Sequence, residues 1–122
     1  MFRILSLLVL FGRGIPIRLT DVGSVAGRWS GFSDPQGDFN EDTYVELTLR
    51  GDGTYDTASP RTVRLMDARG RVQLNCGRLL IEGRHGASGT ATLFSVDGER
   101  TLFVEMAASR TRSVTARLRP KP

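Results

Sequence analysis

The side chains that most often carry chemistry are few in this chain and lie far apart. His85 is its single histidine and Cys76 its single cysteine. A structural zinc site needs four ligands, so these two residues cannot build one. One cysteine also excludes a disulfide within the chain. We expect Cys76 to be buried as a small apolar residue rather than free to pair between chains, and His85 to lie in an exposed, glycine-rich loop.

The acidic and amide side chains between residues 34 and 42 are the other candidate ligands. Their oxygens are of the kind that Ca²⁺ prefers, but the spacing does not match a calcium-binding loop, so we interpret the segment as a solvated acidic loop. No G-x-S-x-G nucleophile motif is present. Gly51 and Gly53 lie in an expected hairpin and not between a strand and a helix, as a nucleotide-binding loop would require. We therefore expect a protein that is not an enzyme, with no cofactor and no metal.

The remaining sequence consists of short segments in which apolar and polar residues alternate. The clearest is 43–50, where every second residue is apolar, as in a strand with one buried face. Asp97-Gly98 is the strongest hairpin signal. Further strands are expected at about 25–33, 54–59, 63–67, 72–74, 78–83, 90–96, 100–106 and 112–119, of which 63–67 could instead be one helical turn.

Eight or nine short strands joined by short loops protect their edges best by closing on themselves. The sequence therefore predicts an all-β fold, a small antiparallel up-and-down barrel of about eight strands. Bulky side chains are expected to fill its interior, in preference to a ligand cavity. The expected inward residues are Trp29, Val45, Leu47, Leu49, Leu65, Leu74, Leu93, Leu102, Val104, Met106 and Leu118.

The N-terminus has the features of a signal peptide. Arg3 precedes the apolar run Ile4–Phe11, which is long enough for a signal-peptide core and much shorter than the ~20 residues that span a membrane. A small-residue site ending at Ser24 divides the chain into a signal peptide or leader, 1–24, and a β-barrel domain, 25–122. The alternative is that the apolar run forms a strand or helix of the domain. Export predicts a periplasmic or secreted protein.

The only tryptophan, Trp29, lies between Gly27 and Gly31, and all three residues share one face of the first expected strand. The interior of an eight-stranded barrel is only just wide enough for side chains. The two glycines are therefore expected to leave room for the Trp29 ring across one end of the barrel.

Gly27-Arg28-Trp29 near the start of a β meander, with an arginine on the last strand, resembles the lipocalin and fatty-acid-binding superfamily, the calycins. The resemblance implies that the G-x-W strand closes one barrel end and that a late arginine packs across the tryptophan. Arg112, Arg117 and Arg119 are the candidates, and Arg112 has the parity of the buried face. The expected barrel-closing residues are Gly27, Trp29, Gly31 and Arg112. The chain is shorter than a typical lipocalin and lacks its disulfides.

Charge is distributed unevenly along the chain, whose formal charge is +4. Residues 34–56 hold seven acidic side chains against one arginine, and residues 100–122 hold six basic ones against one glutamate. The C-terminal basic cluster could make a peripheral membrane contact with anionic lipid or attract a partner. Phe94 and Phe103, the main candidate stacking residues, lie in no RNA-binding motif, so we expect no nucleic acid partner.

Together these features predict a non-enzymatic exported barrel with a binding or scaffolding role in the cell envelope. Its partner would be a small apolar ligand or a protein. The alternative is an inhibitor of an extracytoplasmic hydrolase, a protease or a lysozyme. Some small exported inhibitors of that kind also resemble this chain in a G-x-W first strand, although they usually carry a pair of cysteines.

Overall fold

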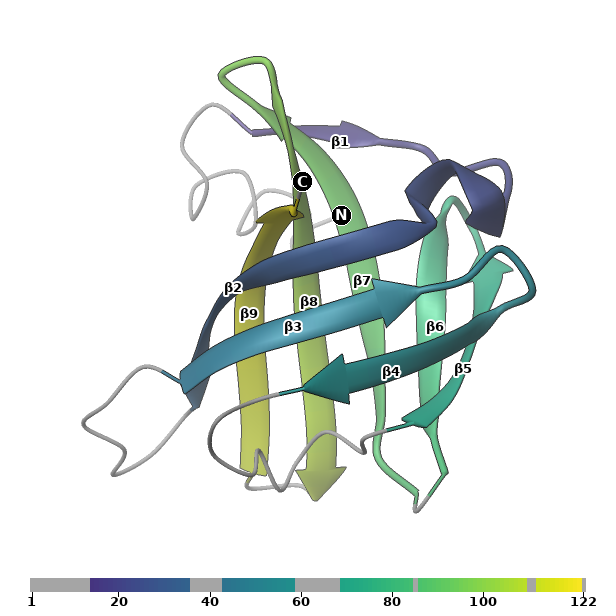
Figure 1. The fold of residues 1–122 in the computed structure, drawn as a ribbon, viewed down its shortest axis with the longest axis vertical. Coiled ribbons are helices and arrows are strands. Elements are labelled where there is room, and N and C mark those ends of the chain that lie inside the picture. The colour runs from purple at the N-terminus through teal and green to yellow at the C-terminus, as the bar shows by residue number, and fades with distance from the viewer. Residues whose placement is uncertain (1–13, 36–42, 59–68, 85, 110–111, 122) are drawn as a thin grey trace.

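A computed structural model of the chain describes residues 14–35, 43–58, 69–84, 86–109 and 112–121. Eight antiparallel strands follow one another around a barrel, each paired with the next (Figure 1). They are β2 (Gly27–Pro35), β3 (Thr43–Leu49), β4 (Thr54–Ala58), β5 (Arg69–Asn75), β6 (Arg78–Gly83), β7 (Ser88–Val96), β8 (Glu99–Ser109) and β9 (Arg112–Pro120). The predicted all-β, up-and-down barrel is confirmed. No helix among the described residues is long and apolar enough to cross a membrane.

The barrel closes where the first of these strands meets the last. β2 pairs with β3 on one edge and with β9 on the other, in a register that runs from Trp29 opposite Pro120 to Pro35 opposite Val114. The two strands approach most closely at Gly31, where an added Cβ would lie 2.0 Å from the carbonyl oxygen of Arg117. A glycine is therefore required at this position for β9 to pair along β2.

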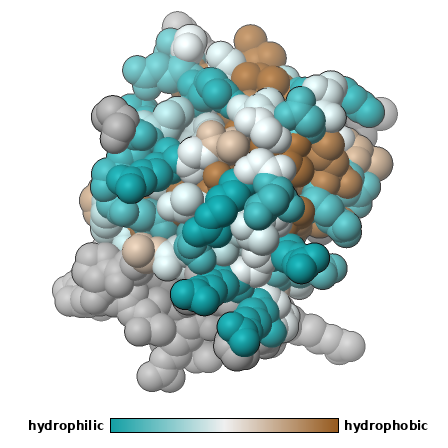
Figure 2. Space-filling view, turned by 45° about the vertical axis from the view of Figure 1, so that its right-hand side comes forward, coloured by the Kyte–Doolittle hydropathy of each residue, from teal (hydrophilic) through white to brown (hydrophobic). Residues whose placement is uncertain are grey.

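Alternating side chains from all eight strands meet inside the barrel. Most of the predicted inward residues are buried there, which confirms them: Trp29, Val45, Leu47, Leu49, Leu93, Leu102, Val104, Met106 and Leu118. Leu65 lies outside the described residues. Leu74 is 37% exposed, so its predicted burial is wrong; it lies beside the tight turn that ends β5. The face of the molecule seen in Figure 2 is largely hydrophilic, with apolar side chains gathered toward one side.

Two hairpins turn on residue pairs with positive φ. Asp97 and Gly98 have φ of 51° and 81°, which confirms the predicted hairpin between β7 and β8. Cys76 and Gly77, with φ of 53° and 83°, turn the chain between β5 and β6 in the same way. Both positions of such a two-residue turn need positive φ. Cys76 is exposed, so its predicted burial is wrong, because the residue lies at the tip of a turn.

The segment before β2 completes the wall and the end of the barrel. β1 (Ile15–Ile17) pairs with residues 93–95 of β7, next to the stretch of the same edge that β6 occupies. The backbone N–H of Leu19 then donates to the carbonyl of Gly77 at 2.8 Å, and the Leu19 side chain is buried in the core.

A short 3₁₀ helix, η1 (Val22–Val25), leads from this segment into β2. Asp21 caps it by accepting a hydrogen bond from the backbone N–H of Ser24 at 2.7 Å. Val25 is fully buried. The predicted division of the chain between residues 24 and 25 therefore falls within η1. Removal of a leader stays a prediction, and residues 1–13 lie outside the described part of the chain.

Gly31→Ala is expected to lower the free energy of unfolding by about 1–3 kcal/mol, because the new methyl group would force β2 and β9 apart. Urea unfolding followed by circular dichroism measures the change. The control is Gly51→Ala, since an added Cβ at Gly51 meets no atom within 4 Å, and it should stay within about 0.5 kcal/mol of the parent. Equal midpoints for the two variants would contradict the described closure.

Candidate functional site

The single tryptophan is buried near the start of β2, beside η1. Trp29 is 2% exposed, and its ring N–H donates to the carbonyl oxygen of Val25 at 2.9 Å. The guanidinium of Arg100, from β8, lies 5.5 Å from the centre of the ring. Arg100 also donates to the carbonyl of Ser24 at 2.6 Å. One arginine therefore holds both the ring and η1, through a cation–π contact and a hydrogen bond.

The glycines on either side of Trp29 are explained by the backbone. Gly27 has a φ of +136°, which side chains rarely allow, and it turns the chain from η1 into β2. At Gly31 the nearest atoms to an added Cβ belong to Arg117 and Leu118 of β9, not to the Trp29 ring. Gly27 therefore allows a backbone conformation and Gly31 allows a close approach of two strands.

The arginine beside Trp29 comes from β8, whereas sequence reasoning sought it on the last strand. Arg112 begins β9 opposite Ser109, while Trp29 pairs with Pro120 at the other end of that strand. The side chain of Arg112 lies outside the described part of the structure. Arg100 could have been predicted from the hairpin at residues 97–98. Arg100 and Leu102 are two residues apart on the strand that follows this turn, so both lie on the inward face.

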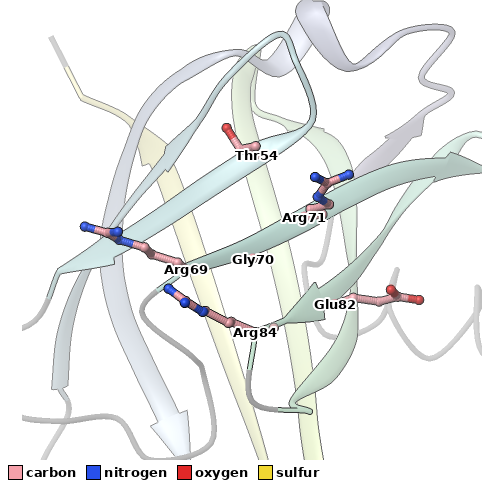
Figure 3. Close-up of a pocket in the computed structure, with 7 residues that line it drawn as sticks. Thr54, Arg69, Gly70, Arg71, Glu82 and Arg84 are labelled. Carbon is pink, nitrogen blue, oxygen red and sulfur yellow. The ribbon is translucent and has the colours of Figure 1, made fainter.

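A second feature is an open hollow of about 350 Å³ lined by residues of β4, β5 and the end of β6 (Figure 3). Arg69 and Arg71 are two residues apart on β5, so both lie on the same face of the sheet. Arg84 directly follows β6, and its backbone N–H donates to the carbonyl of Arg69 at 3.0 Å. In Figure 3 the side chains of Arg69 and Arg84 extend to the same side, and Glu82 points away from both.

Among the described residues, the ion pairs near this hollow involve Arg69 but not Arg71 or Arg84. Asp56 is bonded to Arg50 and lies 3.7 Å from Nε of Arg69. Arg71 and Arg84 make no side-chain hydrogen bond or ion pair with any described residue. Two guanidinium groups whose five N–H donors are not used by any described side chain therefore border the hollow.

The C-terminal basic run, in contrast, is partly neutralised. The ammonium of Lys121 bonds to the carboxylate of Glu46, and Arg119 lies 3.4 Å from Glu99. The hydrogen bond from Lys121, followed by one from Tyr44, holds the pKa of Glu46 below its usual range. The same contact with Glu46 raises the pKa of Lys121. This pair is therefore fully charged at neutral pH, and little free positive charge remains at the end of β9.

The other chemically active side chains come together nowhere in the described part of the chain. No group of three or more His, Cys, Asp or Glu residues there could hold a metal ion. Phe94 and Phe103 are buried, with 1% and 4% of their surface exposed. His85 and most of the acidic loop, residues 36–42, lie outside the described residues.

Comparisons with known proteins give no relative. No protein-family model, no curated protein and no solved structure matches the chain. The barrel itself has two distinctive features in its described part, the buried Trp29 with Arg100 and the arginine-lined hollow.

Trp29→Ala is expected to lower the free energy of unfolding by about 3–5 kcal/mol, because it empties a buried ring-sized volume at the barrel end. The matched control is Phe32→Ala, an aromatic residue of the same strand that is 58% exposed and pairs edge-on with Tyr44. Its cost should not exceed about 1.5 kcal/mol. Chemical unfolding followed by circular dichroism measures both, and equal losses would contradict the structural role of Trp29.

Proposed function

We propose that the protein is a non-enzymatic small β-barrel of the cell envelope whose role is to bind a partner, and that it does so through its outer surface. A protein partner fits this role better than a small apolar ligand held inside the barrel. We prefer a protein partner to an internal ligand because the described interior of the barrel is tightly packed.

The space around two inward-facing glycines shows how tight this packing is. An added Cβ at Gly89 would lie 2.0 Å from the carbonyl oxygen of Glu105 and 2.6 Å from the sulfur of Met106. One at Gly70 would lie 2.3 Å from the carbonyl oxygen of Glu82 and 2.5 Å from the ring of Tyr55. Real Cβ atoms essentially never approach other atoms so closely. Ligand pockets in proteins, in contrast, usually hold several hundred Å³ of space. Around these residues the interior has no room for an additional methyl group, which supports binding outside the barrel.

Membership of the lipocalin-like superfamily is part of this proposal. It is supported by the eight-stranded closed meander, by Gly27-Arg28-Trp29 at the start of β2, and by the arginine packed on the tryptophan. A periplasmic or secreted location is supported by the signal-like leader alone. The alternative function, inhibition of an extracytoplasmic hydrolase, uses the same compartment and the same scaffold.

Expression of the full chain in a Gram-negative host tests the proposal. Cell fractionation should place the protein in the periplasm or the medium, and native mass spectrometry should show a barrel without bound lipid. A cytoplasmic protein would contradict the location, and a stoichiometric lipid would contradict binding through the outer surface. Activity assays of lysozyme and of serine proteases in the presence of the purified protein test the alternative function. Tight inhibition of either enzyme would show that the protein is a hydrolase inhibitor.

A further inference from the structure

The net positive charge of this protein is concentrated in one segment of the sequence, residues 61–84. Residues 61–84 contain six arginines and two acidic residues, a formal +4. The whole chain has 17 basic and 13 acidic residues, so the remainder has 11 of each and is formally neutral. The described part of the segment is β5 and β6, which border the arginine-lined hollow.

The residues that line the hollow are themselves unbalanced. Arg69, Arg71 and Arg84 face a single acidic lining residue, Glu82, which leaves a formal +2. Asp56 reduces this excess only in part, because one of its oxygens is bonded to Arg50 and the other lies 3.7 Å from Nε of Arg69. Arg71 lies directly opposite Glu82 on the neighbouring strand, whereas Arg69 and Arg84 are neighbours joined by a backbone hydrogen bond. Like charges on neighbouring strands repel each other, so the excess charge of Arg69 and Arg84 is electrostatically unfavourable. A bound anion with two negative charges would neutralise it.

The chemistry of the donors indicates which anion fits. A guanidinium presents its N–H groups in a rigid planar fork, and a carboxylate has two oxygens that a single fork satisfies. The forks of Arg69 and Arg84 come from adjacent strands and extend to the same side (Figure 3). An acceptor that serves both needs more than two oxygens. A phosphomonoester has three terminal oxygens and a charge close to −2 at neutral pH.

We infer that the hollow between β4, β5 and β6 binds a phosphomonoester, with Arg69 and Arg84 as the direct ligands and Arg71 adding charge beside them. The open shape of the hollow suits a phosphate at the end of a larger molecule. This site goes beyond the proposed function, and it stands whether or not the protein is exported. The phosphate could belong to a soluble metabolite or to a phosphomonoester lipid headgroup.

Titration of the full chain with phenyl phosphate tests the site, with the side-chain Nε–H signals of the arginines followed by NMR. We expect saturable shifts at Arg69 and Arg84 in the millimolar range. Binding should weaken as the pH falls through about 6, where the ligand loses its second charge. Phthalate, a dianion with carboxylates in place of the phosphate, should bind more weakly.

Two variants that each remove one positive charge distinguish a specific phosphate site from general electrostatic attraction between the anion and the protein. Arg84→Gln should weaken phenyl phosphate binding at least about tenfold, whereas Arg28→Gln, at an exposed arginine of β2, should leave it unchanged. Unaltered Trp29 fluorescence shows that each variant is folded. Shifts that do not saturate, equal losses in the two variants, or equal binding of phthalate would overturn the proposal.

Co-sedimentation with phosphatidylcholine vesicles that contain phosphatidic acid separates the two sources of the phosphate. Binding that Arg84→Gln abolishes and Arg28→Gln does not would assign the site to a lipid headgroup. Phenyl phosphate binding with no vesicle binding would assign it to a soluble phosphomonoester. Absence of both would overturn the inference.

Discussion

The pairing of β2 with β9 is the interaction on which the rest of the structure depends. Seven residue pairs join the two strands, and without them the eight strands would form an open sheet with two exposed edges. Gly31 makes the pairing possible because its backbone lies against the carbonyl of Arg117. Closure removes both edges and brings Gly31 of β2 beside Leu118 of β9, whose side chain lies in the core.

Closure leaves two open ends, and one of them is covered by residues near the start of the chain. Trp29, η1 and Arg100 form this cover, and the hydrogen bonds to the carbonyls of Val25 and Ser24 satisfy backbone groups that the short helix leaves unpaired. β1 extends the wall beside β7 at the same end. The barrel and this cover therefore depend on each other. The arginine-lined hollow lies elsewhere, on strands that pair with neither β1 nor β2.

Sequence patterns predicted the elements well where a strand alternates over several residues. The strand at 78–83 has the predicted bounds, and the Asp97-Gly98 hairpin forms as expected. β1 was missed because three residues are too short for alternation to be visible. The turn at Cys76-Gly77 was missed because cysteine is not among the residues that usually signal a turn. Cys76 was expected in the core for another reason, because free cysteine is among the most often buried residue types.

The candidate sites required information that the sequence does not contain. Trp29 was singled out because of its type and its neighbours, but its arginine, Arg100, follows from the register of a hairpin. The hollow brings together side chains of β5 and β6 that no spacing rule connects. The uneven charge was visible in the sequence, yet only the ion pairs Lys121–Glu46 and Arg119–Glu99 show that the C-terminal run is partly neutralised. Free positive charge then remains on β5 and at the end of β6.

Interstrand nuclear Overhauser effects between β2 and β9 test the central claim, closure of the barrel, most directly. The described register predicts backbone contacts between Gly31 and Leu118 and between Ser33 and Ala116, together with slow amide exchange on both strands. A spectrum in which β2 shows contacts with β3 alone, and in which the amides of β9 facing β2 exchange rapidly, would mean an open sheet and would contradict this account.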